Sequence, residues 1–334
     1  MNMITDKKQI DQLATGLTLR AAQWSDLEAV VALVRDVLTA DGDAVSATTP
    51  GELEREWKTE GFVLETDAFV VTNADGHVVG YEEFVNRHAH AALQGDGYVH
   101  PDFRGLGIGT TLLRALEERA RKEMELAEPD LRVAIMNGMS AADKVSCEMH
   151  ESEGYRLIRH FWMMEVNLAE APKVIPFPNG IELRPFIKDV HEYLVFQAED
   201  EAFRDHWRHV PGNFNAWKLR KLGREEFDPA LWHIAWDGDQ IAGYAQTLYR
   251  NGVGWIGNLG VRRPWRKRGL GEALLLHAFN EFYKRGMLKI GLGVDASNPT
   301  GATRLYQKVG MQIAIEDVVY EKELRPGREL EISE

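Results

Sequence analysis

Residues 104–109 read RGLGIG and residues 266–271 read RKRGLG, and the two stretches are variants of one glycine-rich loop. Each follows an apolar segment that ends in valine (Val99 or Val261), and each leads into a segment with helical apolar periodicity. A strand, a glycine turn and a helix in that order direct unpaired backbone N–H groups and the positive end of the helix dipole at one spot. Each loop therefore predicts an anion site, most simply a site for phosphate.

The two loops belong to a longer internal repeat. Residues 76–81 (GHVVGY) return as residues 239–244 (DQIAGY), about 160 residues further along, and nearly the same interval separates the loops. A repeat of this length indicates a duplicated domain, because the units of solenoid arrays are several times shorter. Residues 171–180 (APKVIPFPNG) carry three prolines, cannot be helical, and predict an extended linker. We therefore predict two domains, residues 1–170 and 181–334.

Each predicted domain contains both helices and strands. Helical periodicity at 26–38 follows a short strand, and further strands follow before the loop. The strand-like runs are 68–73, 77–84, 231–236 and 240–249, and hairpin turns are predicted at 75–76 and 237–238. Since the strands run together instead of alternating with helices, the predicted fold class is α+β, a mixed αβ domain occurring twice.

Composition narrows the classes of partner. The 334 residues include 52 acidic and 39 basic side chains, a formal charge of −13, which disfavours nucleic acid and acidic membrane surfaces and favours cationic substrates. Residues 262–268 (RRPWRKR) are locally basic and suggest a polyphosphorylated small ligand beside the second loop. The single cysteine permits no internal disulfide, and neither a signal-peptide core nor a membrane-length apolar run is visible, so we expect a cytoplasmic protein.

Two other phosphate-binding loops fit poorly. A Walker A loop needs Gly-Lys-Ser/Thr, whereas Gly109 precedes Thr-Thr and Gly271 precedes Glu-Ala. A dinucleotide-binding fingerprint follows the first strand of its domain, whereas these loops come late in each repeat. Nucleotide hydrolysis is therefore disfavoured, and dinucleotide binding has little support.

The pattern resembles the GCN5-related N-acetyltransferase (GNAT) superfamily, whose signature loop is Arg/Gln-x-x-Gly-x-Gly/Ala. Both loops match it, through Arg104, Gly107 and Gly109 in the first copy and Arg266, Gly269 and Gly271 in the second. Residues 295–311 also resemble a later segment of the family. The resemblance covers nearly the whole chain as two tandem domains. In plan it is similar to tandem acetyltransferases of the mycothiol synthase type, which does not fix the substrate.

The resemblance implies a fold and a reaction. Each domain is expected to have a mostly antiparallel mixed sheet, flanked by helices and splayed where the cofactor binds. The implied reaction is direct transfer of an acetyl group from acetyl-CoA, as co-substrate, to a primary amine of a small molecule. The C-terminal domain is expected to be the main catalyst, and the N-terminal domain is expected to bind CoA or to be structural.

The resemblance also implies a set of site residues and no metal. In the second domain Val261 N–H is expected to polarise the thioester carbonyl, and Tyr306 to protonate the departing thiolate. The other cofactor-binding residues implied there are Leu259, Arg266, Lys267, Arg268, Gly269, Leu270, Gly271, Glu272 and Asn298. Those implied in the first domain are Val99, Arg104, Gly105, Gly107 and Gly109.

The first domain departs from the pattern at the sulfur end. His150 stands where the second domain has Tyr306, and Ala142 where it has Asn298. Histidine can donate a proton, so activity stays open, but the simpler hypothesis is a domain that binds without catalysing. Cys147, one helical turn before His150, is expected to be a buried structural residue.

The acceptor side is less clear. Residues 198–207 (AEDEAFRDHW) supply Glu201 and Asp205, two carboxylates one helical turn apart that could bind a cationic amine and accept its proton. His206 could face the same side and Trp207 could add a cation–π surface, although a solvated helix explains the segment equally well. Similar tandem proteins often have glycine at the next position, where this chain has Arg208.

Other hypotheses stay open at this level. The chain could be a non-catalytic acyl-CoA-binding or sensor protein, or a transferase of a longer acyl group. An amino sugar, a polyamine, an antibiotic, a thiol-precursor amine or a peptide N-terminus could each be the acceptor, and the sequence does not give the oligomeric state.

Overall fold

A computed structural model describes residues 13–209, 212–224, 227–298 and 300–330. The chain forms two compact units. Of the described residues, unit 1 comprises 13–159 and 317–330, and unit 2 comprises those between 160 and 316. Each unit contains one of the two glycine loops and, as predicted from the sequence, combines helices with a sheet.

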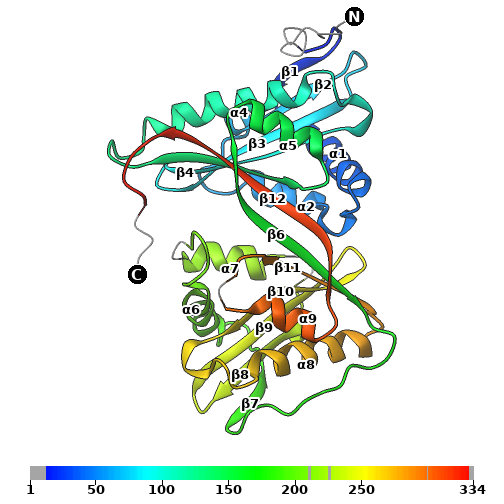
Figure 1. Cartoon of the computed structure of the whole chain (residues 1–334), viewed down its shortest axis with the longest axis vertical. Helices are drawn as coiled ribbons and strands as arrows, with labels where there is room; N and C mark the ends of the chain where they lie inside the picture. The colour runs from blue at the N-terminus through cyan, green and yellow to red at the C-terminus, as the bar shows by residue number, and fades with distance from the viewer. Residues whose placement is uncertain (1–12, 210–211, 225–226, 299, 331–334) are drawn as a thin grey trace, which may run out of the picture. The chain divides into compact units, whose positions relative to one another are not determined.

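Unit 1 is built around a sheet with strand order β1-β2-β3-β4-β5-β12 (Figure 1). Its strands are β1 (Thr18–Ala21), β2 (Ala68–Thr72), β3 (Val78–His88), β4 (Ala92–Val99), β5 (Val133–Ser140) and part of β12 (Gln312–Arg325). Its helices are α1 (Leu27–Ala40), α2 (Pro50–Trp57), α3 (Leu64–Asp67), α4 (Ile108–Met124) and α5 (Lys144–Ser152). Helices α1–α3 share one apolar core with β2 and β3, and α4 packs on the other face, against Val71 and Val79.

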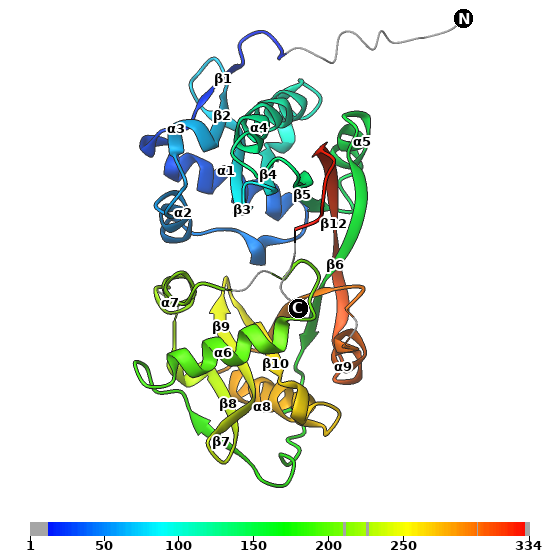
Figure 2. The ribbon, with the colours of Figure 1, turned by 90° about the vertical axis from the view of Figure 1, so that its left-hand side faces the viewer.

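Unit 2 repeats this plan with strand order β6-β11-β10-β9-β8-β7. Its strands are part of β6 (Arg156–Asn167), then β7 (Ile181–Pro185), β8 (Trp232–Asp237), β9 (Gln240–Arg250), β10 (Val253–Val261) and β11 (Lys289–Asp295). Its helices are α6 (Glu192–Phe203), α7 (Phe214–Leu222), α8 (Leu270–Lys284) and α9 (Ala302–Lys308). Figure 2 shows α6 and α8 on opposite sides of these strands, in agreement with two separate apolar cores.

Alternation along the strands explains the two cores. In β8, Ile234 and Trp236 pack with α6 and α7, whereas Ala235 between them packs beneath α8. Local sequence also sets where helices begin. Helix α2 starts at Pro50 behind a capping box of Thr49 and Glu52, while α4 and α8 start at left-handed glycines, Gly107 and Gly269.

The compact units differ from the predicted division into residues 1–170 and 181–334. Residues 161–167 of β6 pair antiparallel with β11 in unit 2, and residues 317–325 of β12 pair antiparallel with β5 in unit 1. Each unit thus takes its last sheet strand from the other half of the sequence. Apolar alternation predicts a strand but cannot tell which of two similar sheet edges it will join. Residues 171–178 between the halves carry no regular secondary structure.

Most predicted elements lie within a few residues of the observed ones. The helix predicted at 26–38 is α1, the strands predicted at 68–73 and 77–84 are β2 and β3, and those predicted at 231–236 and 240–249 are β8 and β9. None of the helices in the described ranges is both long and apolar enough to cross a membrane.

Candidate functional site

The loop between β10 and α8 presents a row of free backbone N–H groups. Lys267 and Gly269 have positive φ angles of 61° and 82°, and Gly269 caps α8 without any side-chain hydrogen bond. Within the described part of the chain, no protein acceptor is found for the N–H groups of residues 267–272. These groups lie at the positive end of the α8 dipole, an arrangement that binds an anion.

The loop of unit 1 has the same backbone form. Gly105 and Gly107 have φ angles of 80° and 78°, matching Lys267 and Gly269 in turn, and Gly107 caps α4. The N–H groups of residues 105–110 also have no acceptor among the described residues. The predicted anion cradle is therefore open in both units.

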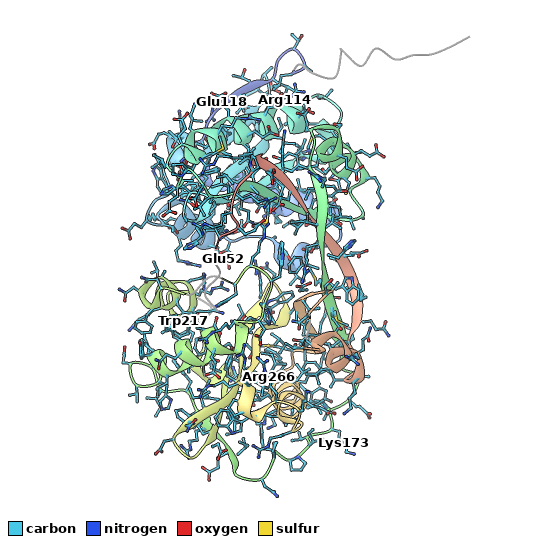
Figure 3. All side chains as sticks on the ribbon, turned by 60° about the vertical axis from the view of Figure 1, so that its left-hand side comes forward. Glu52, Arg114, Glu118, Lys173, Trp217 and Arg266 are labelled. Atoms are coloured by element: carbon cyan, nitrogen blue, oxygen red, sulfur yellow. The ribbon has the colours of Figure 1, made fainter. Side chains whose placement is uncertain are left out.

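The arginines of the second loop turn towards α6 instead of projecting freely. Arg266 donates to the Val261 carbonyl oxygen (3.0 Å), to the Ala202 carbonyl oxygen (3.1 Å) and to Asp205 Oδ2 (2.9 Å), and Figure 3 labels it on the loop before α8 (Figure 3). Arg263 also pairs with Asp205, and Arg262 pairs with Glu201 at 2.6 Å. Of the basic residues predicted to surround a polyphosphate, Arg263, Lys267 and Arg268 are exposed; Arg263 is paired with Asp205, and Arg268 donates to the Asn179 carbonyl oxygen at 3.4 Å.

The predicted acceptor carboxylates Glu201 and Asp205 are therefore engaged in ion pairs. The guanidinium groups of Arg263 and Arg266 lower the pKa of Asp205, which makes this carboxylate a weaker proton acceptor. Glu201 and Arg262 also line a groove of about 600 Å³ between α6 and the β8–β9 turn, which Val261 and Tyr306 do not line. These contacts favour a role in anchoring the loop to α6 over contact with an amine.

His206 and Trp207 are also occupied. The His206 ring packs on Phe203, with centroids 4.2 Å apart, and burial lowers its pKa. The guanidinium of Arg208 lies 5.0 Å from the Trp207 ring centroid, so a side chain of the same chain takes the proposed cation–π surface. Arg208 has a φ of 52°, in the left-handed region that glycine adopts without strain.

Strand β10 separates from β11 before it reaches the loop. The parallel pairing between them covers only Gly254 and Trp255, whereas pairing with β9 continues to Val261. A bulge between Ile256 and Asn258 accompanies the separation. Because the Arg262 N–H bonds back to Ala242 O of β9, alternation turns the Val261 N–H to the opposite, open edge. We call this opening the splay of unit 2.

The remaining residues predicted to bind the cofactor lie at the loop and the splay of unit 2 or pack against them. Leu259 lies on the splayed part of β10, and Leu270 is buried at the start of α8. A Cβ on Gly271 would contact Leu305 and Val261, at 3.4 and 3.6 Å. Glu272 pairs with Lys308 at 2.6 Å. Asn298 Oδ1 accepts from the Thr300 N–H (2.8 Å), which leaves its amide N–H groups as the available donors.

Tyr306 lies on α9 and is 7% exposed. Burial raises its pKa to about 12, so the phenol keeps its proton at neutral pH. No hydrogen-bond partner for its hydroxyl is found among the described residues. The side chain therefore combines a protonated donor with a mostly apolar surrounding.

Unit 1 has the same splay with different side chains. Strand β4 pairs with β5 only through Ala92–Gly95, and the His100 N–H bonds to Val79 O, so the Val99 N–H faces the open edge. Arg104 pairs with Asp41 at 3.2 Å. Met149 packs over Gly109, as Leu305 packs over Gly271.

His150 is a buried core residue of unit 1. Its Nδ1 lies 2.8 Å from Ser146 O, its ring packs edge-on against Tyr155, and burial lowers its pKa. Cys147 is 9% exposed within an apolar cluster, and burial raises the pKa of its thiol, which fits the structural role predicted for it. Ala142 is exposed and has no polar side chain to replace the Asn298 amide.

The sequence reasoning overlooked a polar cluster on the α6 side of the unit 2 splay. Glu199 Oε1 accepts from Asn258 Nδ2 (2.6 Å), and Glu199 Oε2 accepts from Gln246 and from Trp217, both at 2.9 Å. Lys221 lies 3.5 Å from the same carboxylate. Asn258 belongs to the part of β10 that pairs with β9 but no longer with β11, so this cluster lies beside the open edge. Glu199 lies two residues before Glu201 in the acidic run, and the rotation of the helix directs the two side chains to different partners.

The described residues contain no group of three or more His, Cys, Asp or Glu side chains arranged to hold a metal ion. The site of unit 2 is thus an anion cradle, an open strand edge, a buried phenol and a hydrogen-bonded carboxylate. The backbone parts of this set recur in unit 1.

Comparisons with known proteins agree on the family. The model of the Acetyltransferase (GNAT) family matches residues 32–135 and 189–311. A mycothiol acetyltransferase of Thermomonospora curvata is 30% identical over 254 residues, covering 74% of this chain and 80% of the relative. The crystal structure of a GCN5-related N-acetyltransferase from Sphaerobacter thermophilus is 36% identical with a TM-score of 0.80, covering 96% of this chain and 100% of that one. A tandem GNAT protein from the clavulanic acid biosynthesis pathway shares the fold at 15% identity, with a TM-score of 0.70 over 93% of this chain and 100% of that one.

Proposed function

Because the chain belongs to the acetyltransferase (GNAT) family, we propose that unit 2 transfers an acetyl group from acetyl-CoA directly to a primary amine of a small molecule. The enzyme class and the mixed αβ fold expected from the sequence are confirmed by the family match. The observation that carries the proposal is the continuous path in unit 2 from an open anion cradle along an unpaired strand edge.

The cradle and the open edge fit the two ends of acetyl-CoA. The free N–H groups of residues 267–272, with Lys267 and Arg268 beside them, suit the pyrophosphate. The unpaired edge of Leu259–Val261 suits the extended pantetheine arm as an added strand, with the Asn298 amide as a further donor. Glycine at the cradle matters because the positive φ of Gly269 would strain any other residue.

The transfer itself forms a C–N bond and breaks the C–S bond of the thioester. The Val261 N–H, aimed at the open edge, donates to the carbonyl oxygen as negative charge develops there. The ammonium group gives one proton to solvent before attack, and its nitrogen loses a second as the amide forms. Tyr306 gives a proton to the thiolate that leaves and then regains one, so the products are the amide, free CoA thiol and one released proton. The apolar surrounding of Tyr306 keeps the phenol proton in place until the thiolate forms.

The acceptor amine is assigned to the side of the splay that carries Glu199. Glu199 is paired with Lys221 of α7 and hydrogen-bonded to Asn258 of the splayed strand, which holds its charge beside the open edge. The partners of Glu201 and Asp205 are arginines of the loop, so these two carboxylates lie at the cradle. We therefore propose Glu199 as the carboxylate that orients the ammonium group and directs its proton away, and Glu201 and Asp205 as residues that position the cradle.

Unit 1 is proposed to bind CoA without transferring an acetyl group. Its cradle and splay are open. The Nδ1 atom of His150, however, is hydrogen-bonded to the backbone, and its ring is enclosed by Tyr155 and Tyr320. His150 therefore has no proton to give at the open edge, unlike Tyr306.

The experiment that tests the proposal combines calorimetry with a thiol-release assay on the full chain. We expect acetyl-CoA to bind, and free thiol to appear only when a primary amine is present. A panel of amino sugars, polyamines and peptide N-termini identifies the acceptor class. Absence of acetyl-CoA binding would overturn the proposal, and binding without thiol release across the panel would favour an acyl-CoA sensor.

A further inference from the structure

The splay of unit 1 is lined by carboxyl groups. Glu83 on β3 and Asp96 on β4 are directly opposite each other across the antiparallel pair. Asp96 is the first residue of β4 beyond its last pairing with β5, at Gly95, so both side chains flank the open edge. Two like charges at opposed positions destabilise a strand pair, so this arrangement needs an explanation.

Aromatic hydroxyls hold these two carboxyl groups in place. Tyr81 Oη donates to Glu83 Oε2 (2.7 Å), and Tyr98 Oη donates to Asp96 Oδ2 (3.0 Å). Trp57 Nε1 in turn donates to Tyr81 Oη (2.9 Å). The carboxyl groups are thus fixed against two aromatic rings, and each keeps an oxygen for which no hydrogen bond is seen in the described residues.

A third carboxyl group approaches the same strand from the other face. Glu82 is 4% exposed, and its Oε1 has no partner in the described part of the chain. A Cβ on Gly97 would collide with its carboxyl group, and one on Gly95 would come within 2.8 Å of Oε1, so Glu82 lies over the side-chain-free strand at the splay. Asn137, the last β5 residue paired with β4, is also 4% exposed, with its Oδ1 unpartnered. Buried polar atoms without a partner are rare in folded proteins, so these two need a water, an ion or a ligand beside them.

In the described residues no ion pair holds this group, and Arg87 only partly offsets its charge from a distance. None of Glu82, Glu83 and Asp96 forms an ion pair there, and Arg87, whose charge acts on Glu83 and Asp96, donates its Nε to Gln94 at 2.7 Å. Burial, and then mutual repulsion with Asp96 and Glu56, raises the pKa of Glu83 to about 8. Burial also raises the pKa of Asp96 to about 6. Burial and repulsion thus disfavour the ionised form of both carboxyl groups, and a bound cation would stabilise that form.

Unit 2 has neutral side chains at the matching positions. Gln246 and Asn258 form the cross-strand pair that corresponds to Glu83 and Asp96, and both amides donate to Glu199. Ala245 occupies the position of Glu82. The negative charge at the unit 1 splay is therefore specific to that unit and is not required by the shared backbone.

We propose that the splay of unit 1 binds the ammonium group of a small amine, with Glu83 and Asp96 as its acceptors and Tyr98 beside it. An ammonium group offers three donors, matches acceptors on several sides, and tolerates aromatic rings as neighbours. An organic cation fits better than a metal ion, because no metal-holding group of side chains occurs in the described residues. This site is separate from the transfer site of unit 2.

The test uses the full chain labelled with ¹³C at the Glu side-chain carboxyl, with n-butylamine as the probe and 1-butanol as its neutral counterpart. Bound ammonium favours the ionised carboxylate, so butylamine is expected to lower the apparent pKa of Glu83 by about 1, while butanol leaves it unchanged. Asp96→Asn is expected to weaken the response at Glu83, and Glu83→Gln with Asp96→Asn is expected to remove the amine-dependent signal of unit 1.

Glu199 serves as the reporter of unit 2 in the same spectra, and thiol release is measured separately on Tyr306→Phe. A failure of the transfer proposal therefore leaves the Glu83 result readable. Equal responses to butylamine and butanol, or an unchanged response at Glu83 in the Asp96→Asn variant, would overturn the inference.

Discussion

The two units share a backbone and differ in what surrounds it. Both have a left-handed glycine cap, free N–H groups at the start of a helix and a strand that leaves its parallel neighbour. Around this frame unit 2 places Tyr306, Gln246 and Asn258, while unit 1 places His150, Glu83 and Asp96. Binding a phosphate and an extended chain depends on main-chain geometry, whereas proton transfer depends on side chains. A duplicated domain can therefore keep the main-chain geometry that binds a ligand while the side chains that transfer protons change.

Acetyl-CoA affinity should respond most strongly to substitutions in the two glycine loops, and it distinguishes one loop from the other. Gly269→Glu places a strained, negatively charged residue at the positive φ of the second loop, so we expect acetyl-CoA binding to unit 2 to weaken about 100-fold and thiol release to fall with it. Gly107→Glu is the matched change in unit 1, and calorimetry on both variants counts the sites. If Gly107→Glu abolished thiol release and Gly269→Glu did not, the assignment of catalysis would be reversed.

The next comparison concerns the sulfur end. Tyr306→Phe removes only the hydroxyl from a buried phenol, so we expect turnover to fall about tenfold or more while acetyl-CoA affinity changes little. His150→Phe in unit 1 is the counterpart, and steady-state kinetics should show no loss of turnover for it. Unchanged turnover in Tyr306→Phe would remove this residue from the mechanism.

Sequence patterns predicted the features that local chemistry determines. The glycine loops required positive φ angles and a following helix, and the structure has both in each unit. The strand exchange was not predictable, because a strand pattern in the sequence does not say which of two similar sheet edges the strand will join. The acidic run 198–207 was recognised, but its roles were not, since charge alone does not say which side of α6 faces the loop arginines.

The unit 1 carboxyl cluster illustrates the same limit. Glu82, Glu83 and Asp96 are ordinary charged residues in the sequence, two of them in a strand with apolar neighbours. Only the register that sets Glu83 opposite Asp96, and the glycines that let Glu82 lie over β4, bring them together. Long-range pairing of this kind carries no local sequence signal.

Comparing KM for the amine with the affinity for acetyl-CoA tests the roles assigned to Glu199 and Asp205. Glu199→Gln should raise KM for the amine about tenfold without changing acetyl-CoA affinity, because its carboxylate lies on the acceptor side of the splay. Asp205→Asn should weaken acetyl-CoA binding about fivefold, because it loosens Arg263 and Arg266 at the cradle. The opposite pattern, with Asp205→Asn affecting only the amine, would restore the first interpretation of this residue as an acceptor ligand.

The smallest expected effect is a pH-dependent gain in stability from making unit 1 resemble unit 2. The raised pKa values mean that folded Glu83 and Asp96 hold protons that the unfolded chain releases. Stability therefore falls as pH rises, from 3.8 to about 6 through Asp96 and from 4.5 to about 8 through Glu83. Glu83→Gln with Asp96→Asn removes this penalty. The double variant should melt about 5 °C higher than the parent at pH 8, with a much smaller difference at pH 4.5. The reciprocal change, Gln246→Glu with Asn258→Asp, should lower the melting temperature increasingly with pH, because it adds two carboxylates beside Glu199. A difference in melting temperature that did not vary with pH would show that the two acidic side chains act through packing and not through charge.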